Sequence, residues 1–137
     1  MRTPGASAMV FAVVAVFSLL GGEVSGHHSR AGYDTDDKIT TLKGTVTEFQ
    51  WRNPHVFLVW AVKDDKGNDL RWTGEFSSPS TMISEGLSRN SFRPGDELAI
   101  TFIPARAGTP QGLVVKIVKP DGRVVIDLSQ RRGLRNP

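Results

Sequence analysis

Apolar residues in the middle of the chain recur with a period of two, which is the spacing of half-buried β-strands. In the predicted strand of residues 39–51, the apolar positions from Leu42 to Val46 are even, whereas Phe49 and Trp51 are odd. This change of phase predicts a bulge, or a strand that bends between two sheets, with Gly44 as the bending point.

Further strands are predicted along the rest of the chain, with one helix between the third strand and the fourth. Residues 55–62 are apolar on both parities and should form a central strand, whereas residues 70–76 alternate. Ser78 and Pro79 are typical of a helix start, and the spacing of the apolar residues after them predicts a short helix. The remaining predicted strands are residues 97–102, residues 113–118 and a short last strand at residues 124–128.

The order of three strands, a helix and two or three more strands predicts an all-β fold with one short helix. We expect a small five- or six-stranded Greek-key barrel, OB-like, with an open sandwich or another small barrel as the alternative. The predicted core consists of large apolar side chains from these elements: Leu42, Val46, Phe57, Val59, Leu70, Trp72, Ile83, Leu98, Ile100 and Val115.

The N-terminus has the pattern of an export signal. Ala8–Leu20 is an apolar run of 13 residues. It is shorter than the roughly 20 residues that cross a membrane, and it suits the core of a signal peptide. Cleavage after Gly26 would start the mature chain at His27, and an uncleaved membrane anchor is the alternative.

We therefore expect a soluble periplasmic or secreted protein with no stable membrane span after cleavage. The predicted organisation is a signal peptide (1–26), an extended N-terminal arm (27–38), a β-barrel domain (39–128) and a disordered basic tail (129–137).

Composition narrows the function classes. The chain has 137 residues, of which 39% are hydrophobic, as expected for one globular domain with tails. The sequence contains no cysteine, which excludes a disulfide scaffold, thiolate metal sites, iron–sulfur clusters and cysteine nucleophiles. The formal charge of +3 is too small for the concentrated basic face that binds nucleic acid, so we expect no nucleic-acid partner.

Short motifs occur in a recognisable order along the chain: HHS at 27–29, YD at 33–34, LKGTV at 42–46, WRNPH at 51–55, Trp72, SPS at 78–80, RPGD at 93–96 and PDGR at 120–123. In this ordered set the chain resembles a family of small exported bacterial proteins known only as a domain of unknown function. The resemblance runs from His27 to about Arg123, and one departure is Arg30-Ala31, where the family pattern has an apolar residue directly after HHS. The resemblance implies export and a small β-barrel, and it supplies no reaction.

The histidines are the candidate metal ligands. The chain has three of them, His27, His28 and His55. Two would stand at the mature N-terminus, where a terminal amine and a ring nitrogen chelate a metal, and a second imidazole would complete a set of three nitrogen ligands. Such a set favours Cu(II), with Zn(II) or Ni(II) behind it. The alternative is a solvated arm and a histidine that is hydrogen-bonded to backbone at a strand end.

A second group of candidates could bind an organic ligand. Trp51, Trp60 and Trp72 lie on three successive predicted strands, where they could form a stacking platform for a sugar or an aromatic ligand, with core packing as the alternative. Glu75 faces outward by strand parity and could line a groove or be an ordinary surface residue. Together with Asn53 in the turn after the first strand, Trp51 and Glu75 are the candidate ligand-binding residues.

No catalytic residue is predicted. No serine lies in a nucleophile-elbow sequence, and no second carboxylate converges with Glu75 for acid–base work. We therefore expect a non-catalytic binding module for an unknown small ligand, without an obligatory cofactor. The alternative is a binding protein for copper or another divalent metal such as Zn(II), using His27, His28 and His55, and an enzyme comes third.

Overall fold

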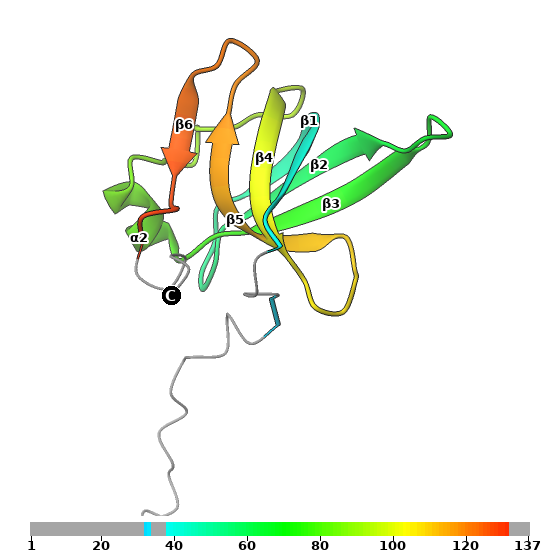
Figure 1. The fold of residues 1–137 in the computed structure, drawn as a ribbon. Helices are drawn as coiled ribbons and strands as arrows, with labels where there is room; N and C mark the ends of the chain where they lie inside the picture. The colour runs from blue at the N-terminus through cyan, green and yellow to red at the C-terminus, as the bar shows by residue number, and fades with distance from the viewer. Residues whose placement is uncertain (1–31, 34–37, 132–137) are drawn as a thin grey trace, which may run out of the picture. The chain divides into compact units, whose positions relative to one another are not determined.

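In the part of the chain that the structure describes, five strands close into a barrel, to which a sixth strand and one short helix are added (Figure 1). A computed structural model describes residues 32–33 and 38–131, so the predicted signal peptide, His27 and His28 lie outside the described residues. The elements are β1 (Thr40–Gln50), β2 (Phe57–Lys63), β3 (Asp69–Glu75), α2 (Pro79–Ser84), β4 (Glu97–Pro104), β5 (Gln111–Val118) and β6 (Val124–Asp127). Within the described ranges, no helix is long and apolar enough to cross a membrane.

The strand pairing is that of an OB-like barrel. Strand β1 pairs with β2 on one side and with β4 on the other, β2 pairs with β3, and β4 pairs with β5, all antiparallel. A short parallel pairing of β3 with β5, from Thr73↔Gln111 to Glu75↔Leu113, closes the barrel. Strand β6 then adds to the free part of β5. The predicted all-β barrel with one short helix is therefore confirmed.

The bend predicted in the first strand is present. Strand β1 pairs with β4 from Thr40 to Thr45 and with β2 from Thr45 to Gln50. The register with β2 shifts between Val46 and Glu48, which is the bulge that the change of apolar phase predicted. A Cβ atom on Gly44 would lie 2.3 Å from the carbonyl oxygen of Ala61, so this crossing of strands requires glycine.

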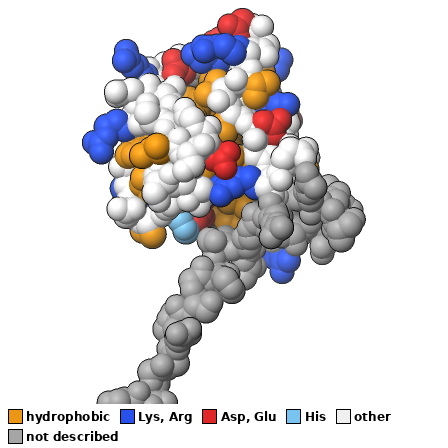
Figure 2. Space-filling view, turned by 90° about the vertical axis from the view of Figure 1, so that its left-hand side faces the viewer, with side chains coloured by type: hydrophobic (Ala, Val, Ile, Leu, Met, Phe, Trp, Pro, Cys, Tyr) orange, Lys and Arg blue, Asp and Glu red, His pale blue; other side chains and the backbone are white. Residues whose placement is uncertain are grey.

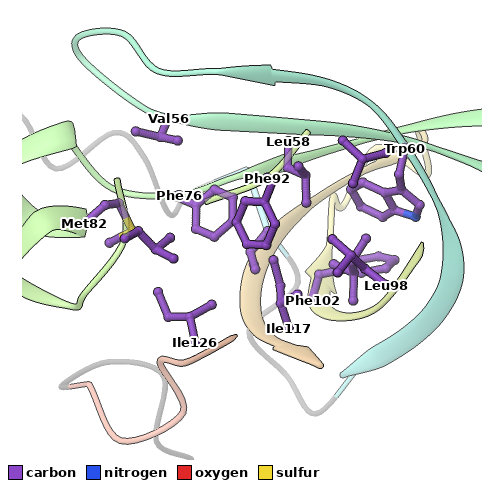
Figure 3. Packing of buried hydrophobic residues seen from close by; sticks show 14 of the residues in the cluster. Val56, Leu58, Trp60, Phe76, Met82, Phe92, Leu98, Phe102, Ile117 and Ile126 are labelled. Carbon is purple, nitrogen blue, oxygen red and sulfur yellow. The ribbon is translucent and has the colours of Figure 1, made fainter. Parts of the chain in front are cut away.

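The barrel interior is apolar and closely packed (Figure 3). Trp60, Leu98 and Phe102 gather at one end of the labelled cluster, and Phe76 and Met82 lie at the other end, towards α2. Trp60 is fully buried and stacks on the half-buried Trp72 at 6.2 Å between ring centroids, so core packing holds for this pair. Other fully buried members are Leu58, Ile100, Ile117, Val46, Val56 and Val114.

Three predicted core residues are wrong. The inward positions of β2 and β3 are the even ones, so Phe57 lies on the outer face, half-buried beneath the guanidinium of Arg52 at 5.4 Å. Leu70 is 45% exposed, because it lies near the β2–β3 hairpin, beyond the packed interior. Ile83 is 62% exposed, because α2 turns Met82 towards the core instead.

The helix begins as its sequence predicted. Ser78 is the N-cap, and its hydroxyl accepts a hydrogen bond from the amide of Thr81 at 3.3 Å. Pro79 occupies the first turn of the helix. The N–H groups of this turn have no carbonyl partner within the helix, so the missing N–H of proline breaks no hydrogen bond. Buried Met82 attaches the helix to the barrel core.

Candidate functional site

The β2–β3 ladder brings His55 and Glu75 to the same outer face of the barrel. Glu75 pairs with Phe57, and the ladder continues past the strand ends, because Val56 donates to the carbonyl of Ser77 at 3.1 Å and accepts from the amide of Phe76 at 2.9 Å. Since side chains alternate along a strand, His55 and Glu75 both point away from the buried side chains of Val56 and Phe76. His55 follows the cis peptide bond between Asn53 and Pro54.

The two side chains are in direct contact. Nδ1 of His55 lies 2.6 Å from Oε1 of Glu75, and the side chains are 30% and 15% exposed, respectively. A carboxylate oxygen accepts the hydrogen bond, so Nδ1 of His55 carries the hydrogen in this contact, and in the neutral form of the ring Nε2 then has the lone pair. Figure 2 shows a histidine beside an acidic side chain at the surface, and His55 is the one histidine among the described residues.

A third residue completes the network. The hydroxyl of Tyr33 donates a hydrogen bond to Oε2 of Glu75, so each oxygen of this carboxylate accepts from a different side chain. Burial of the phenol, together with the hydrogen bond and the negative charge of Glu75, raises the pKa of Tyr33 well above its usual range. The hydroxyl therefore keeps its proton and remains a donor at neutral and moderately alkaline pH.

Tyr33 belongs to the predicted arm and is held against the outside of the barrel. Its ring packs in a small apolar cluster with Ile103 and Val115, separate from the main core, and Ala105 and Leu113 pack against this cluster. Its backbone forms an isolated bridge with Ala105. The part of the arm that the structure describes is therefore docked, and it ends at the same carboxylate as His55.

The structure joins only some of the predicted ligand-binding residues. Glu75 is at the centre of the network and is not the exposed surface residue of the alternative interpretation. Trp51 is half-buried and packs edge-on against Phe49 at 5.8 Å, at the margin of the main core. Asn53 is exposed in the turn that leads to His55.

Comparison with known families identifies the chain. The model of a family of unknown function, DUF6152, matches residues 15–116. The chain belongs to this family. The matched range includes Tyr33, His55, Glu75 and Arg106, so the whole network lies in the part of the chain that defines the family. No curated protein matches the chain, and the family carries no activity that could be transferred to it.

The metal candidates are divided between described and undescribed residues. Among residues 32–33 and 38–131, no three side chains of His, Asp or Glu are grouped as a metal site would require. His55 contributes one ring nitrogen, whereas His27 and His28 lie outside the described residues. The set of three nitrogen ligands stays a prediction.

Sequence reasoning missed Tyr33 and Arg106. Nε of Arg106 donates to the carbonyl of Tyr33 at 2.9 Å, and the amide of Arg106 donates to the carbonyl of Gly32 at 3.0 Å. Tyr33 is the only tyrosine of the chain and stands in an otherwise polar arm, a pattern that could have indicated a docking residue. Its partners could not have been found in this way, because they lie on distant strands and loops.

Proposed function

We propose that this protein is an exported, non-catalytic binding module that presents Nε2 of His55 to its ligand. One observation carries the proposal: Glu75 accepts from Nδ1 of His55 and is itself held by Tyr33, so the imidazole is oriented through one nitrogen, while no hydrogen bond to Nε2 is present among the described residues. The His55 side chain is 30% exposed, so part of the imidazole is open to solvent in the folded barrel. Such preorganisation lowers the entropic cost of binding.

A divalent metal ion, Cu(II) before Zn(II), is the ligand candidate that this geometry favours. Histidines that bind metals usually donate their second ring N–H to a carboxylate or carbonyl, which fixes the tautomer and makes the ligating nitrogen more basic. Glu75 has this relation to His55. The remaining ligands would come from His27, with its amine free after cleavage at Gly26, and from His28.

Chain length permits these ligands to meet. His28 precedes Tyr33 by five residues, and five extended residues span at most about 18 Å. Tyr33 is in turn one carboxylate away from His55. Tethering by the same chain would raise the effective concentration of the terminal nitrogen atoms around His55.

Export and ligand occupancy can be tested together. Native mass spectrometry of protein purified from the exported fraction should show a chain that begins at His27 and carries an additional bound mass. His55→Ala should lose that mass, whereas Asn90→Ala, at an exposed loop position, should retain it. A chain that still contains Ala8–Leu20, or a bound mass indifferent to His55→Ala, would contradict the proposal.

The metal candidate has its own titration. Cu(II) and Zn(II) are added to the processed protein, to the same protein with the amine of His27 acetylated, and to His55→Ala. If the terminus chelates, acetylation should weaken binding by about 100-fold or more, because one tethered ligand is lost while every imidazole remains. His55→Ala should weaken binding as well. Equal affinities in the three proteins would mean adventitious binding at the surface and would eliminate the metal candidate.

An enzyme remains the third candidate. A nucleophile would have to lie within hydrogen-bond reach of the imidazole. In the part of the chain that the structure describes, the side-chain partner of His55 is Glu75, a carboxylate that is already occupied by Tyr33. The binding module is therefore the proposal that these contacts support best.

A further inference from the structure

Two hydrogen bonds attach Gly32 and Tyr33 to the loop between β4 and β5. Arg106 donates from its side chain to the carbonyl of Tyr33 at 2.9 Å and from its own amide to the carbonyl of Gly32 at 3.0 Å. The residue before Arg106, Ala105, forms the isolated bridge with Tyr33. Consecutive backbone groups of the arm are thus fixed by consecutive residues of one loop.

The side chain of Tyr33 continues this attachment into the candidate site. Its ring is 8% exposed and packs on Ile103 and Val115, and its hydroxyl reaches Glu75. Glu75 lies at the parallel β3–β5 pairing that closes the barrel, where its backbone neighbour is Leu113 of the same apolar cluster. The side chain of Tyr33 therefore connects the arm to the place where β3 and β5 close the barrel, and to the carboxylate that orients His55.

We propose that Gly32–Tyr33 is a positioning strap, fastened by Arg106, which sets the tautomer of the His55 imidazole through Glu75. This inference rests on the proposed function, since it assigns the groups that keep Nε2 of His55 free for the ligand. Tyr33 and Arg106 are positioning residues, because they act on His55 through Glu75. With the hydroxyl on Oε2, the carboxylate is held in the rotamer that offers Oε1 to Nδ1 of His55.

The tautomer of His55 can be measured without any ligand. Long-range ¹⁵N NMR at a pH at which the imidazole is neutral distinguishes a protonated Nδ1 from a protonated Nε2, and His55→Ala identifies the resonance. The wild-type protein should show Nδ1–H at His55. Tyr33→Phe keeps the buried ring but removes the hydroxyl, and it should shift His55 towards a mixture of the two tautomers.

Arg106→Gln should shift the tautomer in the same direction, because the strap loses its side-chain hydrogen bond. When it is added to Tyr33→Phe it should cause no further shift, since Arg106 acts through the Tyr33 hydroxyl, and such non-additivity is the signature of one pathway. Arg71→Gln is the matched control, because Arg71 contacts Glu48 on the barrel surface at 3.1 Å and not the strap.

The strap proposal is wrong if the His55 tautomer is unchanged in Tyr33→Phe. It is also wrong if the tautomer shifts caused by Tyr33→Phe and Arg106→Gln add fully in the double variant. Thermal unfolding of each variant verifies that the barrel is folded when the spectrum is recorded. The consequence for a ligand is tested with Zn(II), for which loss of an outer hydrogen bond typically costs about 10–100-fold in affinity. A tautomer shift in Tyr33→Phe, with neither Cu(II) nor Zn(II) bound by the wild-type protein or any variant, would support the strap and reject the metal candidate, so the two proposals fail separately.

Discussion

The barrel interior and the outer face around Tyr33 both bury apolar side chains, but they do so for different reasons. In the interior, β1 to β5 surround Trp60, Phe102 and their neighbours, and the cluster contains no charged side chain. On the outer face, three buried residues, Tyr33, Ile103 and Val115, cover a small area and end at the hydrogen-bonded pair of Glu75 and His55. We expect the interior to contribute most of the stability of the fold, whereas the outer cluster also positions the polar groups of Tyr33, Glu75 and His55.

The largest loss of stability is expected when a large side chain in the barrel interior is truncated. Phe102 is fully buried, and its ring contacts Trp60 and Trp72 with centroid distances of 5.7 and 5.0 Å. Phe102→Ala should lower the free energy of unfolding by about 3–5 kcal/mol, through lost burial and the cavity that remains. Denaturant titration measures the change, with the exposed Ile83→Ala as control at about 0.5 kcal/mol or less. Equal losses in the two variants would mean that the inward and outward positions are assigned wrongly.

Adding a methyl group to the interior should lower the free energy of unfolding by less than removing a ring does, but by more than a substitution at the surface. A Cβ atom on Gly112 would lie 2.2 Å from the ring of Phe102, so Gly112→Ala should destabilise the protein by about 1–3 kcal/mol. Phe102→Leu makes room for this atom. The double variant should therefore be more stable than the sum of the two single losses, and strict additivity in unfolding experiments would contradict this packing.

Removing one oxygen from the outer cluster should have a smaller effect on stability. Tyr33→Phe keeps the buried ring and deletes the hydrogen bond to Glu75, with an expected loss of about 1.5 kcal/mol for a bond to a charged acceptor. Equilibrium unfolding compares it with the wild-type protein and with Tyr33→Ala, which also loses the ring. A hydroxyl deletion as costly as the ring deletion would show that the apolar cluster contributes little.

The same hydroxyl predicts a pH dependence. The pKa of Tyr33 is raised in the folded protein, above the value of about 10 for an unfolded tyrosine. The folded state therefore holds the proton more tightly, so this stabilisation is complete below about pH 10 and declines at higher pH, by at most about 1.4 kcal/mol per pH unit. Because the chain has one tyrosine, its tyrosinate absorbance reports this group directly. A midpoint at the ordinary value, or the same alkaline decline in Tyr33→Phe, would contradict the buried hydrogen bond.

The smallest effect is expected for an ion pair that belongs to neither region. Arg71 and Glu48 approach within 3.1 Å on the barrel surface, with side chains 66% and 46% exposed. Solvent screens such pairs, so Arg71→Gln should change the unfolding free energy by about 0.5 kcal/mol or less. A larger loss would place this pair among the structural interactions and would disqualify it as a control for Arg106→Gln.

Local patterns in the sequence determined the elements of this protein. The apolar phase of β1 located its bulge, and Ser78 with Pro79 located the start of α2, because each feature depends on residues a few positions apart. The candidate residues His55 and Glu75 were likewise recognisable one at a time, from their place at a turn and on the polar side of a strand.

Tertiary structure decided which residues meet. Both parities of β2 are apolar, so the inward position of Trp60 and the outward position of Phe57 depend on how the barrel closes. Tyr33 lies 42 residues from Glu75 and 73 residues from Arg106 along the chain. No short-range periodicity encodes such contacts, because they arise only when the parallel pairing of β3 with β5 brings the two strand ends to one outer face of the barrel.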